Sequence, residues 1–586
     1  MLRPMLHLTK QSYRVFAALA AIFLLTAPAH SLDLPEGASG FAQKPLVKAK
    51  KHMIVAAHPL ATQAGLDMLR KGGAAIDAGI AAQMVLTLVE PQSSGIGGGA
   101  FVLYWDAAQE TLTNYDGRET APAGATPELF LDAAGNPLPR PVAMHSGLSV
   151  GVPGVLAVLK LVHDEYGKLP WAELFHPAIK LARAGFPVSA RLSKMLGDAD
   201  INTFDAVARA YFFDKNGKPH SAGTVLKNEE LAQTLETLAN EGIEAFYEGP
   251  IASDIVKTVQ SDQRGASTLS EKDFADYQPK KRPAVCVPYR SVSVCGMGPP
   301  SSGAVAVGQA LGMIEPFDLG TSPIDPSAMH ALVEAQRLAF ADRARYLADS
   351  DFVSVPVAGL LDKEYLATRR SLIDPDRAVE EVTHGTPPNV SGSFGRDATK
   401  ESGGTSHISV IDGNGDAFSM TTTIEFAFGA RSMVRGFLLN NQLTDFSFLP
   451  KDKDGEEVAN RVEPRKRPRS SMDPTMIFGP DGDLEYVLGS PGGAGIILFN
   501  LKAIVAMLDW GLNPAEAAAL INFGGTPRGV LLETGEDGDE LENALDSKGH
   551  TVRRVPMTSG LHIIAVTPDG LEGGADPRRD GVALGD

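Results

Sequence analysis

Basic residues are scarce in this sequence relative to acidic ones. The 53 lysines and arginines face 71 aspartates and glutamates, which gives a formal net charge of -18. Proteins bind phosphate backbones through basic faces, so this balance argues against a nucleic-acid partner. Small zwitterionic or amine-bearing substrates remain compatible with it.

Cysteine is almost absent: only Cys286 and Cys295 are present. They flank residues 288–291, and a two-residue turn at Arg290-Ser291 would set them opposite each other. An oxidising compartment would permit a disulfide there, whereas two small buried side chains would explain the pair equally well. Two lone cysteines and dispersed histidines lack the spacing of metal ligands, so the sequence predicts neither a metal nor a cofactor.

Long apolar runs are also missing, apart from one near the N-terminus. The stretch Val15 to Ala29 follows basic residues and no acidic one, and it ends in small residues. This arrangement predicts a signal peptide over residues 1–31, cut after Ala29 or Ser31. A membrane anchor is the alternative, but the run is short for a span and no stop-transfer pattern follows it. The mature protein is expected to have no membrane span and to be periplasmic or secreted.

Helical and strand-like patterns alternate along the rest of the chain. Apolar residues three or four apart predict helices, and short apolar runs predict strands. Asp325 followed by Pro326 is typical of a helix cap and first turn. With no internal repeat, the pattern predicts an α+β or layered α/β fold. The clearest elements are helices beginning near Ala61, Ile76 and Pro326, strands over 484–488 and 562–566, and a helix over 498–508.

Two long segments carry few signals of helix or strand. Residues 448–469 are rich in Pro, Lys and Asp, and Pro, Gly and Ser cluster in residues 386–404. Such compositions are typical of surface loops, so both segments are predicted to be exposed. The basic run 461–469 is expected to be solvated, given the acidic composition of the whole chain.

A predicted β-hairpin surrounds Thr405. Residues 405–412 form one strand, 413–415 a three-residue turn, and the return strand begins at Asp416. Counting back from the turn places Thr405 opposite Thr423, where Cβ atoms lie about 5 Å apart. Side chains alternate along a strand, so both threonines share one hydroxyl-rich face. That face also carries His407, Ser409, Ser419 and Thr421.

The residues around Thr405 indicate how it could act as a nucleophile. A threonine hydroxyl attacks poorly unless a base removes its proton. A threonine at a new N-terminus can use its own α-amine, whose unperturbed pKa is about 8. Gly404 can adopt backbone angles closed to other residues, which would suit the strained peptide of a self-cleaving chain. A Thr/Ser-rich strand without chemistry is the alternative.

Several further motifs occur in a fixed order along nearly the whole mature chain. They are 90–99 (EPQSSGIGGG), 117–122 (GRETAP), 299–303 (PPSSG), 334–343, the Thr405 hairpin, 439–446 (LNNQLTDF), 467–472 (RPRSSM) and 489–493 (GSPGG). With these motifs the sequence resembles the γ-glutamyltranspeptidase family, a branch of the N-terminal nucleophile hydrolases. Glycines 95–99 alone would be weak evidence, because they lack the lysine of a phosphate-binding loop.

The resemblance implies a precursor that cuts itself between Gly404 and Thr405. A large subunit would cover residues 32–404, and a small catalytic subunit would cover residues 405–586. The two products would stay together as a heterodimer. Their implied fold is a four-layer αββα sandwich of the α+β class.

The same resemblance implies catalytic roles for four residues. Thr405 matches the nucleophile and cleavage site, and Thr423 matches a second threonine that assists processing and holds the nucleophile. Gly492 and Gly493 match the oxyanion hole, in which backbone N–H groups stabilise charge on the attacked carbonyl. Taken alone, these glycines could be an ordinary turn.

Substrate-binding roles are implied in the same way. Arg118, Ser470 and Ser471 match the groups that hold the substrate's α-carboxylate, a task suited to a guanidinium and hydroxyl donors. Taken alone, Arg118 could be a surface charge and the serines part of a loop.

A second group, Glu425, Gln442 and Asp445, matches the residues that bind the substrate's α-ammonium. Position 425 is Glu here where some members carry Asn, and a carboxylate can still bind an ammonium. Asp445 alone could be a surface charge. Residues 448–469 lie where some members have a lid with a tyrosine. The only aromatic residue here is Phe448, so the resemblance does not decide whether a lid closes over the site, and larger acyl acceptors could enter.

The leading hypothesis is a γ-glutamyltransferase and glutathione hydrolase. Thr405 would attack the γ-carbonyl of glutathione or another γ-glutamyl compound and pass the glutamyl group to water or to an amino acid or peptide acceptor. A glutaryl or cephalosporin acylase is the second hypothesis. Its substrates lack the α-ammonium and would leave Glu425 and Asp445 without a charged partner. The third hypothesis is a non-catalytic periplasmic binding protein that remains one intact chain.

Overall fold

The computed structural model describes residues 40–586, apart from 323–324, 393, 402 and 536–537. The predicted signal peptide, residues 1–31, lies outside the described residues. Among the helices that are described, none is long and apolar enough to span a membrane.

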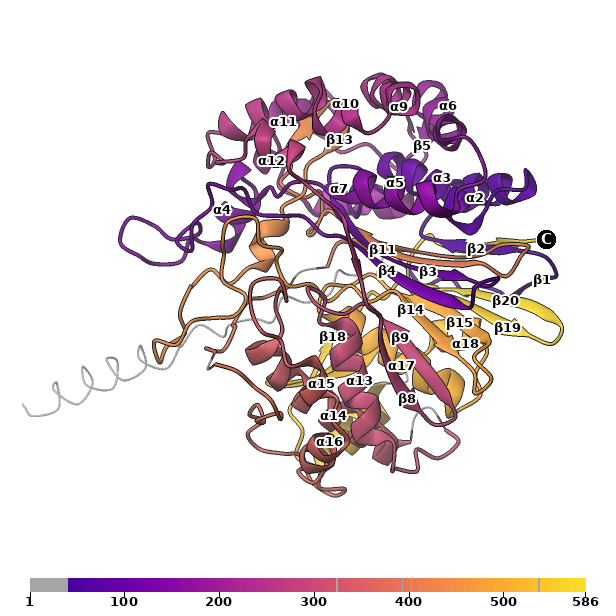
Figure 1. Ribbon diagram of the computed structural model, residues 1–586, viewed down its shortest axis with the longest axis vertical. Helices are drawn as coiled ribbons and strands as arrows, with labels where there is room; N and C mark the ends of the chain where they lie inside the picture. The colour runs from indigo at the N-terminus through magenta and orange to yellow at the C-terminus, as the bar shows by residue number, and fades with distance from the viewer. Residues whose placement is uncertain (1–39, 323–324, 393, 402, 536–537) are drawn as a thin grey trace, which may run out of the picture.

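Two seven-stranded sheets lie face to face in the middle of the molecule (Figure 1). Neighbouring strands are antiparallel throughout both sheets. Sheet I has the order β1 (Val47–Ala49), β20 (Gly570–Ala575), β19 (His562–Thr567), β15 (Leu484–Gly489), β14 (Thr475–Phe478), β9 (Val292–Gly296) and β8 (Val285–Tyr289). Sheet II has the order β21 (Val582–Gly585), β2 (Met53–Ala56), β10 (Thr405–Ile411), β11 (Ala417–Thr423), β3 (Gly99–Asp106), β4 (Thr111–Gly117) and β7 (Lys280–Arg282).

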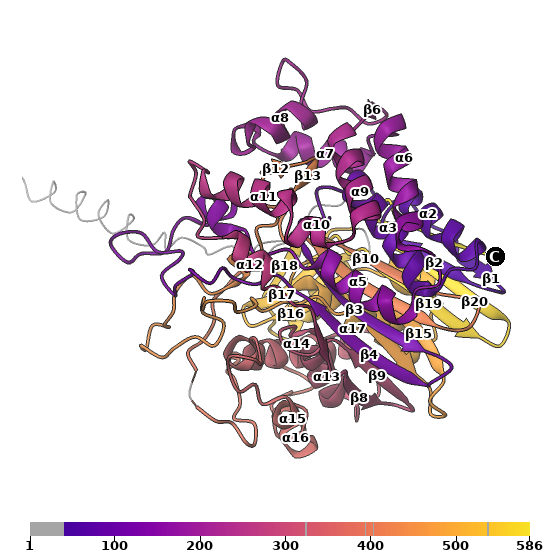
Figure 2. The ribbon, with the colours of Figure 1, turned by 45° about the horizontal axis from the view of Figure 1, so that its top comes forward.

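Helices cover the outer face of each sheet, which completes the predicted αββα sandwich (Figures 1 and 2). On the sheet II side lie α2 (Pro59–Arg70), α3 (Ala75–Val89), α5 (Val155–Tyr166), α6 (His176–Ala184), α7 (Ala190–Asp198), α8 (Ala206–Phe212), α9 (Glu229–Glu241), α10 (Glu244–Tyr247), α11 (Pro250–Gln260) and α12 (Glu271–Ala275). On the sheet I side lie α13 (Gly303–Ile314), α14 (Pro326–Tyr346), α15 (Val357–Leu360), α16 (Lys363–Arg370), α17 (Gly495–Leu508), α18 (Pro514–Ala519) and α19 (Gly538–Ser547).

The predicted helices and strands are present with small shifts at their ends. Asp325 caps α14 by accepting hydrogen bonds from the backbone of Ser327 and Ala328, as its place before Pro326 predicted. Helix α17 begins at Gly495, three residues before the predicted start. Every residue of α3 is buried, because this helix lies between sheet II and the outer helices η2 (Trp171–Phe175) and α6. Apart from Asp77, Gln83 and Thr87, its residues are apolar, as expected for a helix enclosed on all sides.

Both sheets combine strands from the two sides of Thr405. In sheet II, β10 lies between β2 and β11, and β11 pairs with β3. In sheet I, β14 pairs with β9, which comes from the first part of the chain. A cut before Thr405 would therefore leave the two fragments held by shared sheets and by a common core.

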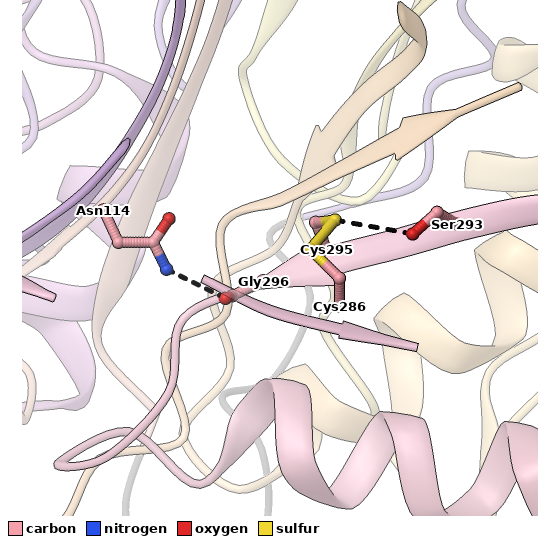
Figure 3. The surroundings of a disulfide bond; sticks show 5 residues. All are labelled: Asn114, Cys286, Ser293, Cys295 and Gly296. Atoms are coloured by element: carbon pink, nitrogen blue, oxygen red, sulfur yellow. Dashed lines mark hydrogen bonds between the residues drawn. A yellow bond between two sulfur atoms is a disulfide. The ribbon is translucent and has the colours of Figure 1, made fainter. Parts of the chain in front are cut away.

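Cys286 and Cys295 form a disulfide with an S–S distance of 2.06 Å (Figure 3). They lie directly opposite each other on β8 and β9, and Arg290 and Ser291 form the predicted two-residue turn. Close by, the Asn114 side-chain amide donates a 2.9 Å hydrogen bond to the carbonyl of Gly296 and so links the two sheets (Figure 3). Of the two interpretations, the structure supports the disulfide.

The expectation that the basic run 461–469 is solvated was wrong. Lys466, Arg467 and Arg469 are buried. Arg467 pairs with Asp116 at 3.3 Å, and the Arg469 guanidinium pairs with Asp397 at 3.0 Å. Acidic residues from distant segments neutralise the run, which composition alone does not reveal.

The exposed-loop predictions hold only for parts of each segment. Residues 453–457 are exposed, whereas 458–460 are buried. Phe448 stacks on Phe130 with ring centroids 4.5 Å apart and lines neither of the cavities described below. Residues 386–392 are mostly exposed, but Gly395, Asp397, Gly403 and Gly404 are buried. A separate three-stranded sheet has the order β16 (Phe523–Thr526), β17 (Gly529–Glu533) and β18 (Val552–Val555). The other short elements are α4 (Arg140–Met144), β5 (Phe186–Pro187), β6 (Val225–Leu226), β12 (Met433–Val434), β13 (Phe437–Leu438), η1 (Gly147–Ser149), η3 (Ile201–Thr203) and η4 (Gln442–Asp445).

Candidate active site

The hairpin of β10 and β11 has the predicted register. Thr405 lies opposite Thr423, and the pairs continue without a shift to Ile411 and Ala417. Ile408 and Phe418 point away from the threonines into the core beneath α3. The alternation of side chains thus orients Thr405 toward the space between the sheets, as the sequence predicted.

Two hydroxyl groups connect Thr405 to the peptide bond that precedes it. Thr405 Oγ1 donates to Thr423 Oγ1 at 3.2 Å, and Thr423 Oγ1 donates to the carbonyl oxygen of Gly404 at 2.6 Å. Thr423 Oγ1 also accepts from the backbone N–H of Glu425 at 2.8 Å. The Thr423 hydroxyl can therefore polarise the Gly404 carbonyl while it holds the Thr405 hydroxyl beside it.

Gly404 is needed for a different reason from the one the sequence suggested. Its φ does not lie in the left-handed region that favours glycine. A Cβ at this position would lie 2.4 Å from the carbonyl oxygen of Glu425. Close backbone packing, rather than a special backbone angle, excludes a side chain there.

The rest of the hydroxyl-rich face joins the two sheets. Ser409 Oγ donates to the carbonyl of His562 at 3.0 Å, and Ser419 Oγ donates to that of Leu488 at 3.2 Å. Burial, with His562 nearby, holds the pKa of His407 well below its usual range, so its ring is neutral. These side chains have a structural role, and only Thr405 and Thr423 reach the candidate site.

Gly492 and Gly493 precede α17, next to Thr405. Both have a positive φ, 138° and 55°, and a Cβ at Gly492 would lie 2.6 Å from the Phe499 ring. Gly493 lines a cavity together with Thr405, whereas Gly492 lines a larger neighbouring cavity. The N-terminus of a helix carries a partial positive charge, so this turn favours a developing anion.

The smaller cavity gathers nine of the ten residues singled out in the sequence. Gly492, in the adjoining cavity, is the tenth. The nine are Arg118, Thr405, Thr423, Glu425, Gln442, Asp445, Ser470, Ser471 and Gly493, and the other lining residues are Glu401, Met472 and Ile496.

Arg118 is a buried residue at the end of β4 rather than a surface charge. Its Nη2 donates to Asp445 Oδ2 at 2.6 Å and to the carbonyl of Arg469 at 2.9 Å, and its Nε donates to the carbonyl of Pro468 at 3.2 Å. Removing one partner of such a buried pair costs about 3–5 kcal/mol, because the remaining charge is unpaired. The guanidinium thus anchors both the loop before Ser470 and the turn that carries Asp445.

Three acceptor atoms face the cavity without a hydrogen bond of ordinary geometry among the described residues. They are Glu425 Oε2, Gln442 Oε1 and Asp445 Oδ1, and all are buried. Gln442 is held in this orientation because its Nε2 donates to Asp445 Oδ2 at 2.7 Å. Buried acceptors normally have partners, so this set indicates a ligand with several N–H donors.

The two carboxyl groups of this set, Glu425 and Asp445, both have raised pKa values. Burial, together with Asp445, raises the pKa of Glu425 to about 8, although Arg140 at 3.5 Å opposes the shift. Burial also raises the pKa of Asp445, against the opposing effect of Arg118. Arg140 and Arg118 therefore offset the effect of burial only in part, and a further cation would stabilise both carboxylates.

Glu401, Arg343 and Arg469 belong to the site but were not predicted from the sequence. The Glu401 carboxylate hydrogen-bonds to Arg343 and Ser471 and lies 3.3 Å from the guanidinium of Arg469. The 334–343 motif, which ends at Arg343, and the charge of Arg469 in the 467–472 motif were the available signals. Nothing local in the sequence indicated that Glu401 meets them.

No cluster suitable for a metal is found in the described ranges, where no three His, Cys, Asp or Glu side chains come together in that way. The chemistry available at the site is that of a hydroxyl nucleophile, backbone N–H groups and charged side chains.

The chain is similar to known proteins in both sequence and structure. A family model described as Gamma-glutamyltranspeptidase matches residues 61–586. The chain is 35% identical over 549 residues to a glutathione hydrolase proenzyme of Bacillus subtilis strain 168, with 92% of each chain covered. It is 37% identical over 551 residues to the glutathione hydrolase proenzyme of Escherichia coli K12, with 91% of each covered. Its structure is similar to that of a cephalosporin acylase from Bacillus halodurans, with a TM-score of 0.82 and 28% identity, over 96% of this chain and 99% of that one.

Proposed function

Because the chain belongs to the γ-glutamyltranspeptidase family, we propose that it is a self-processed γ-glutamyl hydrolase and transferase acting on glutathione and related γ-glutamyl compounds. It is an enzyme of that family, so the hypothesis of a non-catalytic binding protein is not retained.

Processing would begin with attack by Thr405 Oγ1 on the carbonyl carbon of Gly404. A C–O bond forms and the C–N bond breaks, so the nitrogen takes a proton and becomes the α-amine of Thr405. Water then hydrolyses the ester, which leaves a carboxylate on Gly404 and a free hydroxyl on Thr405. The hydrogen bond from Thr423 to the Gly404 carbonyl supports this step, because it would stabilise negative charge on that oxygen.

In the catalytic step, the new α-amine would take the Thr405 hydroxyl proton as the oxygen attacks the γ-carbonyl of the donor. The backbone N–H groups of Gly492 and Gly493 would stabilise the oxyanion. The amine then leaves with a proton, and the glutamyl ester is transferred to water or to the amine of an amino acid or peptide. These steps would take place in a heterodimer of the large subunit, residues 32–404, and the small subunit, residues 405–586.

The observation that carries the choice of donor is the set of unsatisfied acceptors on Glu425, Gln442 and Asp445. An α-ammonium offers three N–H donors and a positive charge, which matches them in number and sign. A glutaryl group would leave the acceptors buried without partners, and that omission is costly. The likeness to a cephalosporin acylase concerns the fold, and a glutaryl substrate would bring no N–H donor to these three acceptor atoms.

Anilide substrates test this choice directly. The purified, cleaved enzyme should hydrolyse a γ-glutamyl anilide with a kcat/KM about 10- to 150-fold above that for a glutaryl anilide, since a charged hydrogen-bonded group is worth about 1.5–3 kcal/mol. Equal rates, or a preference for the glutaryl compound, would favour the acylase hypothesis.

Glu425→Gln should reduce this preference. The amide keeps the shape but removes one negative charge, so kcat/KM for the γ-glutamyl anilide should fall about tenfold, mainly through KM, while the glutaryl value stays within about twofold. Glu456→Gln, on the exposed part of the 448–469 loop, is the matched control and should change neither value. A parallel loss on both anilides would mean that Glu425 has only a structural role.

The raised pKa of Glu425 also predicts a pH dependence. In the free enzyme this carboxyl group is protonated below a pH of about 8, and it binds an ammonium well only when charged. From pH 6.5 to 8.5, kcat/KM for the γ-glutamyl anilide should therefore rise more steeply than for the glutaryl anilide. The Thr405 amine affects both substrates equally, so in Glu425→Gln the two profiles should become parallel.

We also propose that the protein is exported. Residues 1–31 would direct the chain to the periplasm or outside the cell, where the disulfide between Cys286 and Cys295 would be stable. Mass spectrometry of the exported protein would locate both the start of the large subunit and the cut before Thr405.

A further inference from the structure

The strand that begins with Thr405 is supported unequally along its two edges. On one edge β11 pairs with the whole of β10, whereas on the other edge β2 pairs only with residues 408–411. Residues 405–407 therefore extend beyond the end of β2. The proposed cut would turn them into a chain end, and chain ends lose order unless they are tied down.

The hydrogen bonds of the hairpin show which way the main chain of Thr405 faces. The backbone N–H of Asp412 donates to the carbonyl of Asp416 at 2.9 Å, so these two residues form a hydrogen-bonded pair. Such pairs alternate with non-hydrogen-bonded ones along an antiparallel ladder. Thr405 and Thr423 lie an odd number of pairs further along, so theirs is non-hydrogen-bonded. The backbone nitrogen and carbonyl of Thr405 therefore point away from β11, toward the edge that β2 leaves open.

Two side chains from the C-terminal part of the chain lie along this open edge in place of a strand. Arg579 Nη1 donates to the carbonyl oxygen of Thr405 at 3.0 Å. Two residues further on, His562 Nδ1 donates to the carbonyl oxygen of His407 at 2.8 Å. Both side chains belong to buried residues, so these hydrogen bonds are shielded from water.

The stem of Arg579 lies next to the turn proposed as the oxyanion hole. A Cβ added at Gly560 would lie 2.9 Å from Arg579 Cδ and 2.5 Å from Pro491 Cγ. Pro491 directly precedes Gly492. One arginine therefore binds the main chain of Thr405 and also lies close to the turn that would face the reacting carbonyl.

The next residue of β10 is held by a second charged group, Glu90, which directly follows α3. Ser406 Oγ donates to Glu90 Oε2 at 2.9 Å. Burial raises the pKa of Glu90 to about 7, and the charges of Arg191, 3.5 Å away, and of Arg579 oppose that rise. The first two residues of β10 are thus each bound by a buried charged side chain, and Arg579 lies close enough to Glu90 to interact with it.

We propose that Arg579 is a positioning residue for the catalytic step, which holds the carbonyl of Thr405 after the cut and so keeps the new amine and the hydroxyl in place. In the precursor, the peptide bond to Gly404 also restrains Thr405, and cleavage removes that restraint. A misplacement of about 1 Å can lower a rate about 100-fold, so Arg579 matters more for turnover than for self-cleavage. This inference rests on the proposed function, because it takes Thr405 to become an N-terminal nucleophile.

Turnover by Arg579→Gln tests the assignment. The variant should still change from one band to two on a denaturing gel, with a half-time within about threefold of wild type. Its kcat for a γ-glutamyl anilide should fall about tenfold or more, while KM stays within about threefold, because the donor's own contacts are intact. Arg579→Lys keeps a charged donor, so its kcat should be about threefold or more above that of Arg579→Gln.

Arg369→Gln is the matched control for the loss of a buried arginine. Arg369 Nη2 donates to the carbonyl of Thr383 at 2.8 Å, on the sheet I side of the molecule. This variant should lose thermal stability, as Arg579→Gln does, but keep kcat within about twofold of wild type. An equal fall in kcat in both variants would show that Arg579 only supports the fold and would overturn the proposal.

Two other results would also overturn it: an Arg579→Gln chain that folds but stays uncut, or one that is cut and keeps the wild-type kcat. Should circular dichroism show that Arg579→Gln is unfolded, Arg579→Lys decides, with an expected fall in kcat of about threefold and an unchanged KM. A wild-type kcat in that variant would contradict the assignment. Failure of the proposed function would look different, because the wild-type chain would then be uncut or inactive on the γ-glutamyl anilide.

Discussion

Replacing Thr405 by alanine is expected to leave one intact and inactive chain. Both proposed steps use the same hydroxyl, first against the Gly404 carbonyl and then against the donor. Its removal abolishes cleavage, so the α-amine that serves as base is never released. Hydrolysis of a γ-glutamyl anilide should fall by about 10⁴-fold or more, as when the nucleophile of a catalytic unit is removed.

A denaturing gel and an anilide assay on the same preparation check this result. Wild type should give two bands and Thr405→Ala one, with the same circular dichroism for both. Thr405→Ser keeps a hydroxyl at this position and should still be cut and active. Two bands from the alanine variant would contradict the mechanism.

Thr423→Val should slow self-cleavage strongly without unfolding the chain. Valine has nearly the shape of threonine but cannot donate to the Gly404 carbonyl or accept from the Thr405 hydroxyl. The loss of one donor to a developing oxyanion lowers a rate by about 10²–10³-fold. The half-time of conversion from one band to two, followed after purification of the precursor, measures the effect.

The neighbouring residue provides a control for Thr423. Thr422 is also buried on β11, but its side-chain oxygen makes no hydrogen bond among the described residues. Thr422→Val should therefore be cut at close to the wild-type rate, and Thr423→Ser should be cut faster than Thr423→Val. If the two valine variants mature equally fast, the hydrogen bond to Gly404 is not what drives cleavage.

The hairpin around Thr405 could be predicted in detail because its signals are local. A turn at 413–415 determines the register, and the register determines which side chains are opposed. The same holds for the Cys286–Cys295 hairpin and for the cap at Asp325. In each case a few consecutive residues contain all the information needed.

Apart from Thr405 and Thr423, the predicted residues of the cavity could be named from the sequence only through the family resemblance. Arg118, Gln442 and Ser470 are more than 300 residues apart at the extremes, and no local pattern places them together. The structure brings them to one cavity, yet their roles in binding stay predictions until the variants are measured.

The burial of side chains was the property predicted least accurately from short segments of the sequence. The basic run 461–469 resembles a solvated loop by composition, but its charges meet Asp116 and Asp397 in the folded chain. Gly404 resembles a residue chosen for its backbone freedom, but the nearby carbonyl of Glu425 is what excludes a side chain. Both errors arise because the partners are distant in sequence.

The sequence by itself determined the hairpin register that places Thr405 opposite Thr423, because turn chemistry and side-chain alternation act over a few residues. Only the tertiary structure decided which charges face one another. It showed three unsatisfied acceptors beside Arg118 and a glutamate, Glu401, held by two buried arginines. Coulomb interactions in a buried site depend on distances between segments far apart in the chain, and those distances exist only once the chain has folded.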